Sequence, residues 1–462
     1  MKILFCSSEV VPFAKTGGLA DVAGALPMAL ENQGHEVRIT IPKYKMVKEQ
    51  KDIATIGKNI KVHFIKNNRL YMRDGIYGDQ KGDYPDNLER FAYYCRETLE
   101  LMKREGFKPD IIHGNDWQTG LMPVYLKTIY KDDPFFKETK TVLTIHNLAY
   151  TGSFEKKQWQ KTGLDESLFS VDGLEYYGKF SLLKGGLIFS DILTTVSPTY
   201  AKEIQTEEFG CGMEGILRRR SEDLYGVLNG IDYSLWDPAV DKLIYKNYSA
   251  KSIEGKLINK QKLISEMGMK LQKKDSPLIG TVGRLAGQKG YNILADIIDE
   301  LCSLDIGFVL LGTGEEKIHK TFEQIAKKYK KKVSINLRFD ASLAQKIYAA
   351  SDMFLMPSRY EPCGLGQLIC FKYATVPVVR KTGGLADTVF EFNKKTQEGN
   401  GFVFDKFDSM ELLKTVKRAL VLYTDKPKWN KLIKKIAGYD YSWNKSAVEY
   451  SRLYKKLQTV SV

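Results

Sequence analysis

Chemistry that depends on thiols or metals has little material to work with in this chain. Among its 462 residues there are only six cysteines and five histidines, and no pair of cysteines has the short spacing of zinc ligands. Thiols this few and scattered are typical of a reducing compartment. We therefore expect a cytoplasmic protein whose cysteines form no disulfides. An Asp-x-Asp pair and a Walker-type loop are both missing, which argues against a metal-bound diphosphate and against an ATPase site.

Long apolar runs are missing as well. No stretch approaches the roughly 18 uninterrupted apolar residues that a membrane-spanning helix needs, so we expect no membrane insertion. The apolar start of the chain is broken by Ser7, Ser8 and Glu9, which favours a buried first strand over a signal peptide. Hydrophobic residues make up 43% and charged residues 27%, which are the proportions of a soluble globular protein.

Acidic side chains are fewer than basic ones. There are 56 aspartates and glutamates against 70 lysines and arginines, a formal net charge of +14. This excess invites an anionic partner, but the lysines are spread over amphipathic stretches such as 318–332 and 426–435, without a nucleic-acid-binding motif. Solvated helix faces explain most of the charge, so we expect no specific nucleic-acid binding, while an anionic small substrate fits the positive field.

What the chain does have is a repeated glycine motif. Lys15-Thr-Gly-Gly-Leu-Ala-Asp21-Val returns as Lys381-Thr-Gly-Gly-Leu-Ala-Asp387-Thr, 366 positions later (381 − 15). Each copy follows a β-rich run and opens a helix-compatible stretch. A Gly-Gly pair there lets a ligand approach the backbone, and the helix N-terminus favours anions, although such glycines can also serve tight turns alone. Our hypothesis is two halves that each offer a glycine loop to a shared ligand.

The length and the strand pattern predict two large domains of one architecture. A chain this long exceeds one ordinary core. Strand-like and helix-like segments alternate along both halves, which predicts the α/β class with two Rossmann-like, doubly wound parallel sheets. We place an N-terminal domain at residues 1–240, a C-terminal domain at 241–440 and a final helix at 441–462. The predicted strands cover residues 2–7, 36–41, 110–113, 141–145, 191–195 and 224–228, and then 278–282, 307–311, 333–336, 352–356 and 376–379.

Ligands of open α/β sheets bind at the carboxyl ends of the strands, so the loops there hold the candidate site residues. In the second half, Arg284 and Lys289 follow the opening strand. A guanidinium can fork onto phosphate oxygens and an ammonium adds a point charge, which suits a diphosphate. Gly364 and Gly366 precede an apolar helical stretch and could offer N–H groups to the same phosphates. Taken one at a time, such cations are more often ordinary exposed residues.

Three further strand-end groups have polar chemistry. Glu361 could orient sugar hydroxyls or stabilise positive charge at a reacting carbon, or serve only as a cap or an ion-pair partner. In the first half, His146 follows a strand and is either a site residue or a core histidine. Asp116 and Trp117 join a hydrogen-bond acceptor to an aromatic ring, as carbohydrate subsites do, although Trp117 could equally belong to the core.

Together these residues resemble the bacterial and plastid glycogen and starch synthases, which are nucleotide-sugar glucosyltransferases of the GT-B fold. The resemblance runs over essentially the whole chain. It is carried by the motif at 15–22, Thr144-Ile-His146-Asn147, Leu228-Asn229-Gly230, Arg284 with Gln288-Lys289-Gly290, Glu361-Pro-Cys-Gly-Leu365 and the motif at 381–388.

The resemblance implies transfer of glucose from ADP-glucose to the non-reducing 4-hydroxyl of an α-1,4-glucan, with retention of configuration and without a metal or other cofactor. It implies two domains facing across a cleft, with the final helix crossing back onto the first domain. The catalytic residues would be Glu361, His146, Arg284 and Lys289, the two cations neutralising the leaving diphosphate. The substrate-binding residues would be Lys15, Gly17, Gly18, Asp21, Asp116, Trp117, Asn229, Cys363, Gly364, Leu365, Gly366, Thr382, Gly383 and Gly384.

The chain departs from the family pattern at four positions. The usual His-Asp-Trp-His run reads Asn115-Asp-Trp-Gln118, Gly366 stands where a hydroxyl residue is common, and Ile369 stands where related retaining transferases have a second glutamate. These changes bear on acceptor and phosphate binding more than on the reaction. Two alternatives stay open: another GT-B transferase that uses UDP-glucose or a small acceptor, and a glucan-binding protein without catalysis.

Overall fold

The computed structural model describes residues 1–79 and 81–459 and divides the chain into two compact units. Unit 1 is residues 1–230 with the final segment from Trp443, and unit 2 is Ile231–Ser442. The predicted boundary after residue 240 therefore lies too late. The reason is backbone pairing, because the N–H of Ile231 donates to the carbonyl of Tyr441 at 2.9 Å within unit 2. Among the described residues, no helix is long and apolar enough to cross a membrane.

Unit 1 is built on an eight-stranded sheet that is parallel except for the edge strand β3. Its strands are so apolar that β1 is buried along all but its first residue, as expected for a parallel sheet covered on both faces. The strand order is β13-β12-β8-β7-β1-β2-β4-β3, so the direction in which successive strands are added to the sheet changes between β1 and β7, which run parallel. The strands are β1 (Lys2–Cys6), β2 (Glu36–Pro42), β3 (Ile53–Ile56), β4 (Ile60–Ile65), β7 (Ile111–Asn115), β8 (Lys140–Ile145), β12 (Ile192–Thr195) and β13 (Leu224–Gly226).

Helices cover this sheet, and two small antiparallel sheets lie apart from it. The helices are α1 (Gly18–Asn32), α2 (Asn68–Tyr71), α3 (Asn87–Arg104), α4 (Leu121–Lys127), α5 (Leu182–Phe189), α6 (Pro198–Glu203), α7 (Glu214–Arg219) and α17 (Trp443–Thr459). The small sheets pair β5 (Gly78–Asp79) with β6 (Gly82–Asp83), and β11 (Lys179–Ser181) with both β9 (Ser153–Glu155) and β10 (Glu175–Tyr176).

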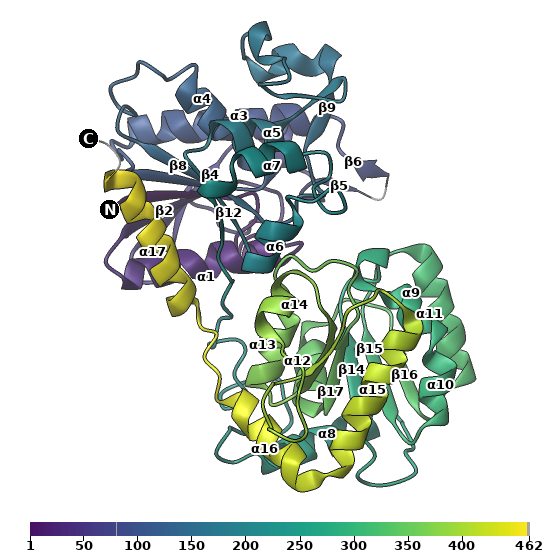
Figure 1. Ribbon diagram of the computed structural model, residues 1–462. Helices are drawn as coiled ribbons and strands as arrows, with labels where there is room; N and C mark the ends of the chain where they lie inside the picture. The colour runs from purple at the N-terminus through teal and green to yellow at the C-terminus, as the bar shows by residue number, and fades with distance from the viewer. Residues whose placement is uncertain (80, 460–462) are drawn as a thin grey trace. The chain divides into compact units, whose positions relative to one another are not determined.

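The final helix α17 belongs to unit 1, where it lies beside α1 (Figure 1). Its buried Tyr454 hydroxyl lies 2.7 Å from Nδ1 of His113 on β7. Its Ser451 hydroxyl lies 2.9 Å from Nε2 of His35, at the far end of α1. The last helix thus supplies a polar partner to each of two buried histidines and is an integral part of this unit.

Unit 2 has the doubly wound topology in its simplest form. Its six-stranded sheet is wholly parallel, in the order β16-β15-β14-β17-β18-β19, and the direction in which successive strands are added changes between β14 and β17. The strands are β14 (Leu278–Val282), β15 (Gly307–Leu311), β16 (Val333–Asn336), β17 (Met353–Met356), β18 (Val376–Arg380) and β19 (Phe402–Phe404). Its helices are α8 (Glu254–Glu266), α9 (Tyr291–Asp296), α10 (Ile298–Ser303), α11 (Glu316–Lys328), α12 (Ala341–Ala350), α13 (Gly366–Lys372), α14 (Gly383–Thr388), α15 (Ser409–Thr424) and α16 (Lys426–Ala437).

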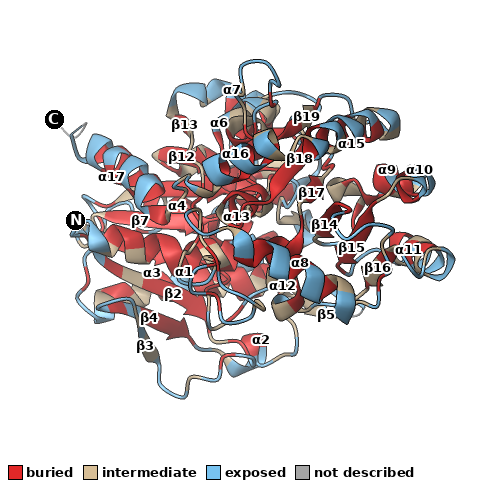
Figure 2. Cartoon of the chain, turned by 90° about the horizontal axis from the view of Figure 1, so that it is seen from below, coloured by how far each residue is buried: buried red, intermediate tan, exposed pale blue. Residues whose placement is uncertain are grey.

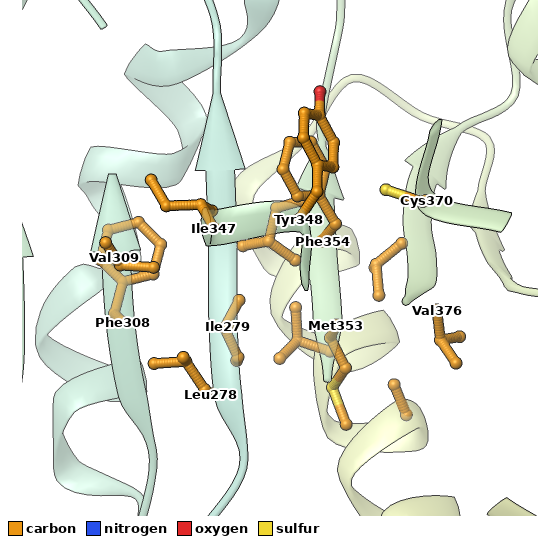
Figure 3. Packing of buried hydrophobic residues seen from close by; sticks show 14 of the residues in the cluster. Leu278, Ile279, Phe308, Val309, Ile347, Tyr348, Met353, Phe354, Cys370 and Val376 are labelled. Atoms are coloured by element: carbon orange, nitrogen blue, oxygen red, sulfur yellow. The ribbon is translucent and has the colours of Figure 1, made fainter. Parts of the chain in front are cut away.

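The core of unit 2 forms where helix side chains meet the central strands. Figure 3 shows Ile347 and Tyr348 of α12 packing over β14, β15 and β17, with Cys370 of α13 beside them. Tyr348 stacks on Phe354 with ring centroids 4.6 Å apart. Helices α11 and α16 turn most of their lysines outward, and Figure 2 shows both helices with an exposed side, while the apolar side of α11 is buried. Solvated lysine faces, as predicted, account for this part of the positive charge.

Candidate active site

The first glycine motif forms an exposed loop between β1 and α1. The ammonium of Lys15 lies 2.7 and 2.9 Å from the two carboxylate oxygens of Asp21, in the first turn of α1, so the structure brings these two predicted residues together. Gly17 has extended backbone (φ −143°), and a Cβ built there meets nothing within 4 Å. Neither backbone strain nor packing calls for glycine at this position. The missing side chain instead keeps the space beside Lys15 clear.

Sequence reasoning missed a carboxylate that holds this loop. Glu9 was noted only as a break in the apolar start of the chain, yet its buried side chain accepts hydrogen bonds from the backbone of Thr16 and Gly17. The spacing of seven and eight residues from Glu9 to those amides has no regular periodicity, so no sequence pattern could have revealed the contact.

Asp116 directly follows β7, at the point where the order of strand addition in the sheet of unit 1 changes. Its backbone has φ 55° and ψ −173°, a strained region that glycine usually occupies, and such outliers gather at functional sites. One carboxylate oxygen accepts the backbone N–H of His146 at 2.7 Å. Burial raises the pKa of Asp116 to about 7, opposed by the N–H groups of His146 and Asn147 and assisted by the charge of Glu9. This carboxyl group therefore titrates near neutrality.

His146 is held as a neutral imidazole, because burial lowers its pKa to about 3. The amide nitrogen of Asn115 donates to the carbonyl of Cys6 at 2.9 Å, which leaves the amide oxygen of Asn115 to face His146 Nε2 at 2.8 Å. Nε2 must then carry the proton and donate, so Nδ1 is an acceptor. Asn115, one of the departures from the family pattern, thus fixes the tautomer of a predicted site residue.

Trp117 and Asn229 are both buried, but only Trp117 is held by ring contacts, and Asn229 has an unpaired side-chain oxygen among the described residues. The Trp117 ring is 9% exposed and packs edge-on against Phe91, with centroids 4.9 Å apart, while a Cβ at Gly152 would lie 2.5 Å from it. Here Trp117 supports Asp116 from the core and presents no open aromatic face. Asn229 is 6% exposed, and within the described part of the chain its side-chain oxygen is buried without a hydrogen-bond partner. That oxygen is an acceptor whose hydrogen-bonding capacity is not used within the described residues.

In unit 2, Lys289 and Glu361 come together from two different strand ends. The Lys289 ammonium lies 2.8 and 2.7 Å from the two carboxylate oxygens of Glu361, and the Ser358 hydroxyl donates to the same carboxylate at 2.8 Å. The Glu361 side chain is 7% exposed and that of Lys289 29%. Lys289 follows β14 and Glu361 follows β17, the two neighbouring strands between which the order of strand addition changes. Ligands of doubly wound sheets usually bind at this point.

Backbone contacts bind the Lys289 loop to the Glu361 loop. The N–H of Arg359 donates to the carbonyl of Gln288 at 2.8 Å, and the Arg284 guanidinium donates to the Gln288 side chain at 3.0 Å. Gly290 has φ 74°, and a Cβ there would lie 1.9 Å from the carbonyl of Pro357. Glycine is therefore required at the end of Gln288-Lys289-Gly290, because only a bare backbone lets the two loops meet.

The second glycine motif supports the Glu361 loop from behind. Gly383 has φ 44°, and a Cβ there would lie 2.0 Å from the carbonyl of Glu361. A Cβ at Gly384 would lie 1.9 Å from the carbonyl of Cys363, and its N–H donates to the carbonyl of Glu361 at 3.1 Å. Thr382 is 1% exposed. In this copy, unlike the first, the glycines serve close packing of two backbones.

The segment between Glu361 and α13 is also closely packed. Gly364 has φ 68°, Leu365 caps α13, and a Cβ at Gly366 would come within 3.2 Å of Met356 and Tyr348. Ile369 is 5% exposed and belongs to the core of unit 2. Within the described residues, no group of three or more His, Cys, Asp or Glu side chains is placed to hold a metal ion.

Family models match both units. Residues 2–219 match the starch synthase catalytic domain, and residues 266–436 match the glycosyl transferases group 1. The chain is 47% identical to a glycogen synthase of Thermotoga maritima over 99% of both chains. It is 48% identical to one of Fervidobacterium nodosum, also over 99% of both.

Solved structures agree with these matches. The catalytic domain of starch synthase IV from Arabidopsis thaliana, bound to ADP and acarbose, superposes with a TM-score of 0.91 at 34% identity over 99% of each chain. A sucrose-phosphate synthase from Thermosynechococcus elongatus shares the fold, with a TM-score of 0.67 at 16% identity over all of both chains. The fold is that of the GT-B glycosyltransferases. Within that class, the chain belongs to the family of glycogen and starch synthases.

The unequal glycines predict unequal effects on stability. Gly384→Ala forces a methyl group into a backbone carbonyl, so we expect it to destabilise the protein by about 2–3 kcal/mol. Gly17→Ala meets open space in ordinary backbone and should change stability by less than about 1 kcal/mol. Thermal and urea unfolding of both variants measure the difference. Equal losses of stability would contradict the distinct roles assigned to the two motifs.

The raised pKa of Asp116 predicts a pH-dependent effect of its neutral isostere. The unfolded carboxyl group ionises near its ordinary value and the folded one at about 7, so this group stabilises the fold at low pH and loses that contribution as pH rises from about 4 to 7. Asp116→Asn stays neutral and can still accept the His146 N–H. The melting temperature of the variant relative to wild type should therefore rise between pH 5 and pH 8; a flat or falling difference refutes the assignment.

Proposed function

We propose that this protein transfers glucose from ADP-glucose to the non-reducing 4-hydroxyl of an α-1,4-glucan, with retention of configuration. It would thus act as an ADP-glucose:1,4-α-D-glucan 4-α-D-glucosyltransferase. Family membership supports the reaction class. The Arabidopsis relative, solved with ADP and acarbose, supports the adenine nucleotide and the α-glucan. In this reaction the bond from glucose C1 to the diphosphate breaks and a bond from C1 to the acceptor oxygen forms.

The pairing of Lys289 with Glu361 is the observation that carries the proposal. Both carboxylate oxygens of Glu361 bind the ammonium, yet a lysine ammonium has three N–H donors and can serve a phosphate oxygen as well. The carboxylate then orients the cation, and the cation stabilises charge on the departing diphosphate. Arg284, held at the same strand end by Gln288, would supply the second cation.

Residues of unit 1 have the chemistry to bind sugar hydroxyls. Neutral His146 has an acceptor at Nδ1, and Asn229 has a buried side-chain oxygen able to accept a hydrogen bond. Asp116 titrates near neutrality and can accept a hydroxyl proton or donate its own. We assign Lys15 and His146 to the donor glucose, and Asp116 and Asn229 toward the glucose and the acceptor. An apolar side chain at any of these positions could not form a hydrogen bond with a sugar hydroxyl.

We further propose that the reaction needs no metal ion or other cofactor, because Arg284 and Lys289 supply the positive charge that a divalent metal gives to many other transferases. Turnover should then be unchanged by dialysis against EDTA. A loss of activity that Mg²⁺ or Mn²⁺ restores would refute this part of the proposal and leave the donor and acceptor assignments to be tested separately.

A donor and acceptor panel tests the function directly. Purified protein is incubated with radiolabelled ADP-glucose or UDP-glucose and with glycogen, maltotriose or glucose as acceptor. We expect label from ADP-glucose to be incorporated into glycogen and maltotriose through α-1,4 links. β-Amylase, which cleaves these links, should then release the label as maltose. A preference for UDP-glucose or for free glucose would favour another GT-B activity. No incorporation from any donor, together with retention on a glycogen column, would favour a binding protein without catalysis.

Removal of the Lys289 ammonium should lower kcat by about 100- to 1,000-fold, the usual size of a lost transition-state charge contact. Lys289→Ala leaves Glu361 unpaired, so a matched control must separate charge loss from instability. Lys260 in the same unit pairs with Asp352 at 2.6 Å, with side chains 4% and 13% exposed.

In the control variant Lys260→Met, another buried carboxylate loses its lysine partner, so the melting temperature should fall. Turnover should stay within about threefold of wild type, because Lys260 contacts Asp352 and Tyr423 and none of the candidate site residues. Equal turnover in the two variants would remove Lys289 from the proposed site.

A further inference from the structure

We propose that Glu9 is a positioning residue that holds the glycine loop of unit 1, residues 15–18, in the form the reaction uses. The inference rests on the proposed glucosyl transfer, since the loop includes Lys15. The glycine motif favours an anion at this loop, because a Gly-Gly turn before a helix exposes N–H groups. The structure shows that an anion of the protein itself already occupies part of that position.

The contacts of Glu9 form a clamp around the loop. One carboxylate oxygen accepts the backbone N–H of Thr16 at 2.5 Å and that of Gly17 at 3.0 Å. The other accepts the Thr16 hydroxyl at 2.6 Å and the Tyr77 hydroxyl at 2.6 Å. Four donors therefore converge on one side chain that is 3% exposed. Charge-assisted bonds of this kind are stronger than neutral ones.

The anchor of the clamp is buried, while the loop it holds is exposed. The Tyr77 hydroxyl also lies 2.8 Å from that of Ser8, and the Tyr77 carbonyl accepts the side-chain amide of Asn87 at the start of α3. Thr16 and Gly17 themselves are exposed. An exposed loop with a glycine pair would otherwise sample many backbone conformations. Glu9 holds the loop against Tyr77, which in turn contacts Ser8 and the start of α3.

The clamp changes what the loop can offer a ligand. The N–H groups of Thr16 and Gly17 are spent on Glu9, so they are not available to a phosphate. What the loop presents is the Lys15 ammonium and the open space beside Gly17. Glu9 thus acts through the loop, by fixing the starting point of the Lys15 side chain, and has no need to touch the substrate.

Three substitutions separate shape from charge. Glu9→Ala removes every contact. Glu9→Gln keeps them in altered form, since the amide oxygen can accept both N–H groups while the amide nitrogen donates to the two hydroxyls. Glu9→Asp keeps the charge but is one methylene too short to reach Thr16 and Tyr77 together. If Glu9→Ala does not fold, Glu9→Asp carries the test.

Asp191 provides a matched control in the same unit. One of its carboxylate oxygens accepts the backbone N–H and the hydroxyl of Thr141, at 2.7 and 2.8 Å. This clamp resembles that of Glu9 but lies at the amino-terminal ends of β8 and β12, opposite the loops with the candidate site residues. Asp191→Ala should lower the melting temperature and leave turnover within about threefold of wild type.

We expect kcat/KM for ADP-glucose to fall about 100-fold in Glu9→Ala and Glu9→Asp, the usual cost of a misplaced catalytic group, and to recover to within about fivefold of wild type in Glu9→Gln. KM for glycogen should change less. In hydrogen exchange followed by mass spectrometry, the peptide containing Thr16 and Gly17 should exchange faster in Glu9→Ala than in wild type or Asp191→Ala.

The two readouts keep the failures apart. A wild-type protein that transfers no glucose refutes the proposed function, while the exchange data still test the clamp. Wild-type turnover in Glu9→Ala or Glu9→Asp overturns the positioning role, and so does unchanged exchange at Thr16 and Gly17. Equal losses of activity in Glu9→Gln and Glu9→Ala would also overturn it, because the effect would then follow the charge of Glu9 and not the shape of the loop.

Discussion

The ion pair between Lys289 and Glu361 is the interaction on which the site of unit 2 depends. A nearly buried carboxylate is costly unless it is paired, and here the partner comes from a neighbouring strand end, so the two loops must lie together. Gly290 permits that approach because a Cβ there would collide with the carbonyl of Pro357, and Gly384 in the same way lets the second glycine motif pack behind the Glu361 loop, against the carbonyl of Cys363. The glycines, the reversal of strand order and the charge pair thus form one arrangement.

The two glycine motifs are equal in sequence and different in use. In the first copy a side chain, the Glu9 carboxylate, accepts the N–H groups of Thr16 and Gly17. In the second a backbone carbonyl, that of Glu361, accepts the N–H of Gly384. Each loop therefore spends backbone donors on a glutamate of its own unit. Only the first motif keeps open space at its leading glycine, so it is the first that can meet a ligand directly.

Much of the fold was predictable because buried parallel strands are short apolar runs. The bounds of β14, β15 and β16 match the prediction to the residue. In the two large sheets, strands β3, β4 and β19 were missed, and Lys61 and His63 interrupt the apolar pattern of β4. In the candidate site, the position after a strand end was enough to predict Lys289 and Glu361 as candidates but not their pairing. Glu9 could not be predicted from the sequence. Its partners depend on the path of an irregular loop and on Tyr77, 68 residues away.

The departures from the family pattern become intelligible through their contacts. Asn115, in place of a histidine, makes two hydrogen bonds with fixed polarity, to Cys6 and to His146, and a titratable ring there would add a charge state beside Asp116. Ile369, in place of a glutamate, packs in the core, where a carboxylate without a partner would be costly to bury. Each replacement removes an ionisable side chain from its position. The chain thus carries its site chemistry on fewer ionisable groups, which makes the geometry of Lys289, Glu361 and Asp116 the more decisive.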